Sequence, residues 1–142
     1  MKQITQQLKL PAELDNLDRV IGFLETKLEQ CDCPMKVVTQ ICVSVEEIFV
    51  NIANYAYPDH MGECLLELTL AGEDDAYNKM VLCIHDSGKQ FDPLKKEDPD
   101  ITLSAEERQI GGLGIWMVKQ SMDQVEYRYE NEKNILTLTK TW

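Results

Sequence analysis

Two consecutive amphipathic helices, placed between one strand and a series of later strands, constrain the fold of this chain more than any other feature. From Pro11 to Leu28, apolar residues recur every three to four positions, the period of a helix with one buried face. A break at Cys31–Pro34 precedes a second helix, predicted from near Pro34 to about Tyr55. Its apolar stripe comprises Val38, Ile41, Val45, Ile48 and Ile52. Both helices need an apolar surface to cover, which favours a sheet as a second layer.

The remaining regular segments are mostly short strands. Their alternating or continuous apolar patterns predict strands at Gln3–Leu10, Cys64–Leu70, Met80–Ile84, Val125–Tyr129 and Ile135–Thr139. A third helix is predicted at Leu113–Met122. The resulting order, β-α-α-β-β-loop-α-β-β, predicts an α+β two-layer sandwich, with helices on one face of a mainly antiparallel or mixed sheet. At 142 residues the chain is expected to form one domain, 1–142.

Charge and composition argue against several classes of partner. The formal net charge of −11 opposes binding to nucleic acid or to an anionic membrane surface, since both require basic residues. No apolar stretch is expected to approach the roughly 20 residues that span a bilayer, and the N-terminus lacks the apolar core of a signal peptide. We therefore expect a cytoplasmic protein. The five cysteines have neither the number nor the spacing of a disulfide framework or zinc site and are expected to be reduced.

Glu47 and Asn51 lie one helical turn apart, so the second helix projects both from one face. A carboxamide oxygen is a suitable ligand for Mg²⁺, beside water and phosphate oxygens. A carboxylate one turn away can orient or deprotonate an attacking hydroxyl group or water. The alternative is a solvated polar face with no chemical role.

The segment Asp86-Ser87-Gly88 follows an apolar strand. An aspartate at a strand end can accept a hydrogen bond from an exocyclic amine such as that of adenine. Glycine at position 88 would let the backbone approach a flat base. The alternative is a simple turn, for which Asp-Ser-Gly is a common sequence.

The segment Gly111-Gly112-Leu113-Gly114 precedes the third predicted helix. Glycines at a helix N-terminus allow successive backbone N–H groups to face phosphate oxygens. The segment is neither a P-loop nor a Rossmann fingerprint, and a glycine-rich hinge is the alternative. The polar residues 87–110, which include Pro93 and Pro99, form a loop long enough to indicate a functional or mobile segment, with room for one helical turn near Ser104–Arg108.

Together, these three segments resemble the motifs of the ATPase family shared by gyrase, Hsp90, histidine kinases and MutL. Within that family, the chain looks most like the stand-alone anti-sigma-factor serine/threonine kinases. The first motif is similar to Val45–Pro58, the second to Asp86–Pro93 with its trailing Phe-Asp-Pro, and the third to Gly111–Ile115. The resemblance covers nearly the whole domain and implies a Bergerat-type ATP-binding fold.

Carried over residue by residue, the resemblance implies a role for each motif position. Glu47 would be the general base and Asn51 the Mg²⁺ ligand, while Asp86 would bind the adenine amine and Gly88 would pack near the base. Phosphate contacts would come from the glycine loop, and the segment 91–110 would be the ATP lid. The implied nucleotide-binding residues are Asn51, Asp86, Gly88, Arg108, Gly111, Gly112, Leu113 and Gly114.

The sequence departs from the family pattern at two places, with Tyr55 where a histidine is frequent and Gln90 where a glycine is frequent. Both departures bear on the protein partner more than on ATP. The resemblance implies an Mg-ATP-dependent kinase that phosphorylates a small anti-sigma-factor antagonist, binds a sigma factor or similar target, and pairs as a homodimer. Two alternatives are a nucleotide-gated protein that sequesters its partner with little or no phosphotransfer, and a slow ATPase with lid-driven dimerisation.

Overall fold

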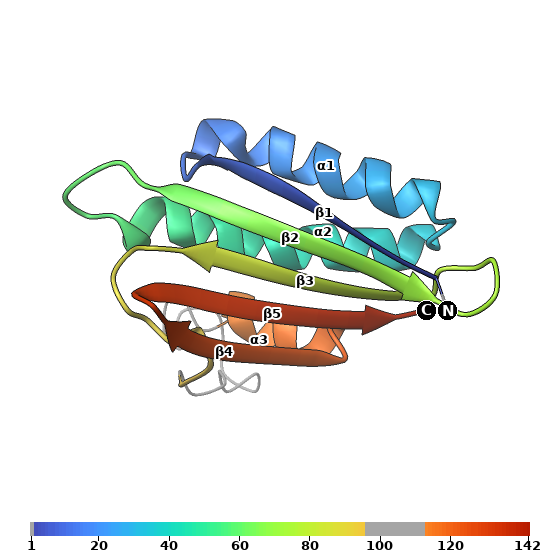
Figure 1. Ribbon diagram of the computed structural model, residues 1–142. Coiled ribbons are helices and arrows are strands. Elements are labelled where there is room, and N and C mark those ends of the chain that lie inside the picture. The colour runs from blue at the N-terminus through green and yellow to red at the C-terminus, as the bar shows by residue number, and fades with distance from the viewer. Residues whose placement is uncertain (1, 96–112) are drawn as a thin grey trace.

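The described part of the chain folds into two layers, a five-stranded antiparallel sheet and three α-helices on one of its faces (Figure 1). A computed structural model describes residues 2–95 and 113–142. The strands are β1 (Lys2–Pro11), β2 (Glu63–Gly72), β3 (Lys79–Asp86), β4 (Gln124–Glu130) and β5 (Lys133–Thr141). The helices are α1 (Leu17–Gln30), α2 (Met35–Asn51) and α3 (Leu113–Ser121). Across the sheet the order is β1-β2-β3-β5-β4, which confirms the predicted α+β sandwich.

Strict alternation of side chains decides which face of the sheet is buried. On β2, Cys64, Leu66, Leu68 and Leu70 are buried, while the residues between them are partly exposed. On β3, the same alternation buries Met80, Leu82 and Ile84. Because the period is two, the next inward residue is Asp86. A carboxylate therefore occupies the end of a core-facing row, beneath the helical layer.

Helices α1 and α2 cover this face with the apolar stripes that their sequences predict. The buried residues are Val20, Leu24 and Leu28 on α1, and Val38, Ile41, Val45, Ile48 and Phe49 on α2. Helix α2 packs against both α1 and α3, so it is the middle helix of its layer. Glu47, on the side of α2 toward α3, lies against Gly114 of that helix.

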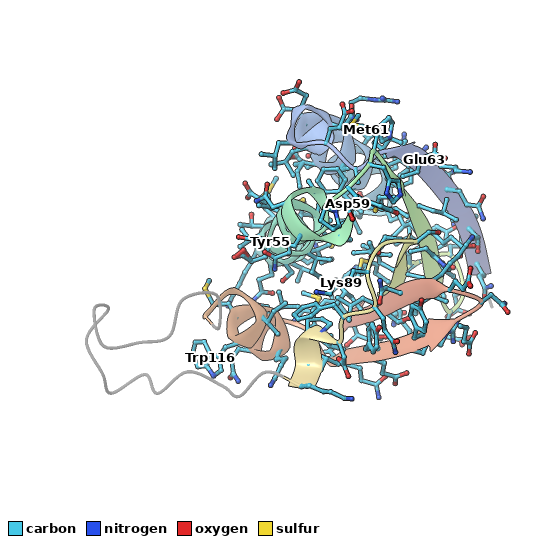
Figure 2. All side chains as sticks on the ribbon, turned by 90° about the vertical axis from the view of Figure 1, so that its left-hand side faces the viewer. Tyr55, Asp59, Met61, Glu63, Lys89 and Trp116 are labelled. Atoms are coloured by element: carbon cyan, nitrogen blue, oxygen red, sulfur yellow. The ribbon has the colours of Figure 1, made fainter. Side chains whose placement is uncertain are left out.

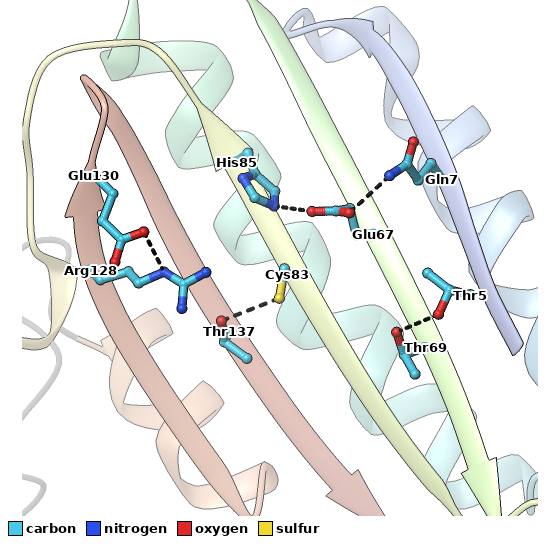
Figure 3. A network of polar contacts seen from close by, with 9 residues as sticks. All are labelled: Thr5, Gln7, Glu67, Thr69, Cys83, His85, Arg128, Glu130 and Thr137. Carbon is cyan, nitrogen blue, oxygen red and sulfur yellow. Dashed lines mark hydrogen bonds and ion pairs between the residues drawn. The ribbon is translucent and has the colours of Figure 1, made fainter. Parts of the chain in front are cut away.

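The opposite face of the sheet is polar (Figure 3). Its cross-strand contacts join Thr5 to Thr69, Gln7 and His85 to Glu67, and Cys83 to Thr137. Polar pairs of this kind fit a solvated face and explain why the helices occupy the other side.

Two helix boundaries differ from the sequence prediction. The first helix starts later than Pro11, because Pro11 is the last residue of β1 and pairs with Glu63. A short 3₁₀ turn, Leu14–Asn16, then leads into α1. The second helix is α-helical only to Asn51 and continues as a π-helical turn, Ile52–Ala56. Such turns are frequent at functional sites. The turn suggested near Ser104–Arg108 lies outside the described residues.

One helix in the described part of the chain, Met35–Ala56 with its π-helical turn, is long and apolar enough to cross a membrane by length and composition. The expectation that no stretch approaches that length is therefore wrong for this segment. Its apolar stripe is buried in the core of the domain, as in the core helix of a globular protein.

All five cysteines are free thiols in this structure. Burial raises the pKa of Cys33 to about 11 and that of Cys64 to about 12. These two thiols are therefore neutral near pH 7, and thiolate chemistry is suppressed at both.

Candidate functional site

A cavity of about 530 Å³ lies where the end of α2 meets the end of β3 and the start of β5. Its walls are largely apolar, with Ile48, Ile84, Ile115 and Leu136 among the lining residues. The polar side chains are few and come from different elements: Asn51, Tyr55, Asp86, Lys89, Tyr127 and Asn134. A mainly apolar cavity of this size with a few convergent polar groups is typical of a small-molecule site.

Asp86 supplies the most deeply placed charge of the cavity, with only 7% of its surface exposed. Its Oδ1 accepts hydrogen bonds from Gly88 N (3.0 Å) and from Asn134 Nδ2 (2.9 Å). No hydrogen bond from the described residues reaches Oδ2, so this oxygen is available to a donor inside the cavity. Burial raises the pKa of Asp86, and the two hydrogen bonds oppose that shift.

Asn134 holds the carboxylate in place, and the sequence analysis did not identify it. Its side chain accepts from Phe91 N (3.1 Å) and Tyr127 Oη (2.5 Å), and donates to Lys89 O (3.0 Å) as well as to Asp86. It is buried, with 6% of its surface exposed. From the sequence, Asn134 reads as the last residue of a turn. Only the register of β3 and β5, which pairs Asp86 with Asn134, reveals its role.

Gly88 allows the loop after β3 to approach the π-helical turn. A Cβ at position 88 would lie 2.3 Å from Ala56 O and 2.6 Å from Ala56 Cβ. The adjacent Lys89 N donates to the same Ala56 O at 2.8 Å. The glycine therefore joins the first and second motifs backbone to backbone. Its contact with a base stays a prediction.

Gly114 and Glu47 join the third motif to the first. A Cβ at position 114 would lie 2.2 Å from Glu47 Oε1 and 2.5 Å from Glu47 Cδ. The carboxylate of Glu47 therefore lies against the backbone at the start of α3. Both residues line a second cavity, of about 480 Å³, between α2 and α3.

Glu47 and Asn51 thus open to different spaces. Asn51 lines the first cavity and Glu47 the second, although they lie one turn apart on α2. Ile48, the residue after Glu47, and Ile115, the residue after Gly114, both line the first cavity. The contact between Glu47 and Gly114 therefore lies at the boundary between the two cavities. A reacting group at this boundary would have Asn51 on one side and Glu47 on the other.

Tyr55 and Lys89, which are both exposed, line the open end of the first cavity (Figure 2). Tyr55 occupies the position where the family frequently has histidine, and 71% of its surface is exposed. An aromatic ring and an ammonium group at the opening suit a ligand that combines a flat ring with phosphate groups.

The other predicted nucleotide contacts fall at the edge of the described chain. Leu113 is the first residue of α3. Arg108, Gly111, Gly112 and most of the predicted lid 91–110 lie outside the described residues, and their roles stay predictions.

The donor set suits a magnesium ion that is shared with a ligand. The described residues contain no group of three or more His, Cys, Asp or Glu side chains able to hold a metal by themselves. Mg²⁺ commonly takes one or two protein oxygens and completes its shell with water and phosphate oxygens. The carboxamide of Asn51 in the cavity wall fits that role.

Comparison with known proteins shows the family of this chain. Residues 10–140 match the family described as histidine kinase-like ATPase domain. A serine/threonine-protein kinase, BtrW of Bordetella bronchiseptica (strain ATCC BAA-588 / NCTC 13252 / RB50), is 28% identical over 100 residues, covering 70% of this chain and 67% of the relative.

Among solved structures, the fold is similar to part of a chain that comprises the RsbU and RsbW domains of Rv1364c from Mycobacterium tuberculosis. The TM-score is 0.68 at 14% identity, over 97% of this chain and 32% of that one, so this chain spans about a third of the neighbour's length. The family match covers most of the chain, including all three motif segments of the sequence, and the chain therefore belongs to the family of histidine kinase-like ATPase domains.

Proposed function

We propose that this chain is an Mg-ATP-dependent protein serine/threonine kinase. Its substrate is a small antagonist of an anti-sigma factor, and it also binds a sigma factor or a similar target. The observation that carries the proposal is that Asp86 and Asn51 line one cavity, while Glu47 lies against Gly114 at its boundary. The similarity to a serine/threonine-protein kinase supports the choice of reaction.

Each of the three side chains has a distinct task in this proposal. Asp86 Oδ2 accepts a hydrogen bond from the adenine amine, with Asn134 and Gly88 fixing the other oxygen. Asn51 supplies a protein oxygen to Mg²⁺, which neutralises phosphate charge when bound. The backbone at the start of α3 faces the phosphates.

Glu47 acts as the general base in the transfer. The acceptor hydroxyl oxygen forms a bond to the γ-phosphorus, and the bond from that phosphorus to the β–γ bridging oxygen breaks. The hydroxyl proton passes to the Glu47 carboxylate, and ADP leaves with the electron pair. Positioning and electrostatics supply most of the rate enhancement in such transfers.

A protein that only sequesters a partner in response to nucleotide would need the same cavity but no base. The half-buried Glu47 carboxylate, which lies against Gly114, favours the kinase.

Calorimetric titration of ATP into the pure protein, with and without Mg²⁺, tests the nucleotide site. We expect Mg²⁺-dependent binding with ATP preferred over GTP. Transfer from [γ-³²P]ATP to candidate antagonist proteins, followed by phosphoamino-acid analysis, tests the reaction. No binding at millimolar ATP would refute the nucleotide site. Binding without transfer to any serine or threonine would leave the sequestering function.

The proposal includes a cytoplasmic location, as expected from the sequence, and a homodimer by resemblance to the family. Sedimentation equilibrium with and without ATP tests the dimer, and a monomer under both conditions would exclude it.

A further inference from the structure

We propose that the groove between α2 and α3 is the docking site for the phosphoacceptor segment of the protein substrate. The inference rests on the proposed kinase function and adds the place and chemistry of substrate recognition. The groove is the cavity of about 480 Å³ that Glu47 and Gly114 line. It accepts a segment that carries the acceptor serine or threonine beside an apolar side chain and a lysine or arginine.

The position of the groove follows from the geometry of transfer. The attacking and leaving oxygens lie roughly in line across the transferred phosphoryl group. ADP occupies the Asp86 side of the boundary in the proposed function, so the acceptor approaches from the other side. The groove lies on that other side, and Glu47 opens to it. A base must be within hydrogen-bond reach of the hydroxyl it deprotonates.

The groove is lined by apolar side chains, two of which are exposed to solvent. Val43 on α2 and Met117 on α3 are 44% and 43% exposed. They belong to opposite walls of the groove, with Val50 and Val118 also in the lining. Exposed methionine is a common feature of surfaces that accept varied apolar side chains. Two helices that present such residues form a groove for an apolar anchor.

The negative charge of the groove favours a lysine or arginine in the bound segment. Glu46 is exposed and lines the groove next to Glu47. No lysine or arginine is among the residues lining the groove in the described chain. A basic residue near the acceptor hydroxyl complements these two carboxylates, while an acidic residue there is repelled.

A peptide array measures both preferences directly. The probes are short synthetic peptides with a central serine or threonine, in which each flanking position is set in turn to lysine, leucine, glutamate or alanine. The wild-type protein with [γ-³²P]ATP and Mg²⁺ is expected to prefer peptides with a lysine and a leucine near the acceptor.

Two variants tie these preferences to the groove. Glu46→Lys should lower the preference for lysine over glutamate by up to about fivefold, the upper end for one exposed charge pair. Its matched control is Glu29→Lys, the same charge change on exposed α1 surface. Met117→Gln should reduce the preference for leucine by a similar factor. Its control is Met35→Gln, at an exposed methionine at the start of α2.

Calorimetry of ATP binding to each variant separates a failure of the docking groove from a failure of the nucleotide site. Preferences that change in Glu46→Lys and Met117→Gln, and not in the controls, establish the groove. Bound ATP with no peptide phosphorylated, no flanking preference, or equal effects in variants and controls would overturn the groove and leave the nucleotide site intact. A wild-type protein that binds no ATP would overturn both proposals.

Discussion

Replacing Asn134 with alanine tests whether one buried side chain holds the Asp86 carboxylate and the loop after β3 together. The change removes two donated hydrogen bonds, to Asp86 Oδ1 and Lys89 O, and two accepted ones, from Phe91 N and Tyr127 Oη. At about 1 kcal/mol net for each bond, the sum is about 4 kcal/mol. The partly exposed partners can bind water instead, so we expect a loss of about 2–4 kcal/mol in the free energy of unfolding.

Urea denaturation of wild type and variant gives this difference directly. The matched control is Asn78→Ala, at an exposed position in the turn between β2 and β3, which should change stability by less than about 0.5 kcal/mol. We also expect weaker ATP binding by Asn134→Ala, because Asp86 loses a donor that orients it. A loss below about 1 kcal/mol for Asn134→Ala, or equal losses in the two variants, would show that the network does not act as a unit.

Four further substitutions test the site. Glu47→Ala should leave ATP affinity nearly unchanged and reduce phosphotransfer by orders of magnitude, and equal transfer rates would remove its role as base. Asn51→Ala should weaken ATP binding only when Mg²⁺ is present, which titrations with and without the metal would show. Asp86→Asn should relax the preference for ATP over GTP. Burial raises the pKa of Asp86, so the folded protein binds this proton more tightly than the unfolded chain does. The stability that the protonated carboxyl contributes is therefore lost as the pH rises through the raised pKa. The asparagine variant should lack this decline in unfolding measurements between pH 3 and neutrality, and matching pH profiles would contradict the raised pKa. Gly114→Ala would place a Cβ 2.2 Å from Glu47 Oε1. It should therefore displace the base, lower the rate of phosphotransfer and reduce the free energy of unfolding by about 1–3 kcal/mol. An unchanged rate of transfer would show that Glu47 moves freely.

The layers of the fold follow from local patterns. The apolar stripes of α1 and α2 and the period-two rows of β2 and β3 are repeated signals, each spread over many residues. Patterns of this kind predicted the order of the five strands and three α-helices in the described residues. They could not locate the end of β1, since its pairing with β2 extends as far as Pro11 and Glu63. Nor could they predict the π-helical turn after Asn51, because one extra residue per turn leaves no clear pattern in the sequence.

The sequence itself determined the candidate chemistry of this protein. Glu47, Asn51, Asp86, Gly88 and Gly114 could be named because their residue types and spacing are set along one chain, and because they resemble the motifs of a known family. The reason is physical: a helical turn, a strand end and a helix N-terminus each fix the direction of a side chain or backbone group within a few residues.

Only the tertiary structure decided how these groups are divided between two spaces. Asn134 joined the site through the register of β3 and β5, at a separation of 48 residues from Asp86. Glu47 and Asn51 opened to different cavities because the start of α3 packs against α2 between them. Contacts between segments far apart in sequence depend on packing and strand register, which no local pattern of residues encodes.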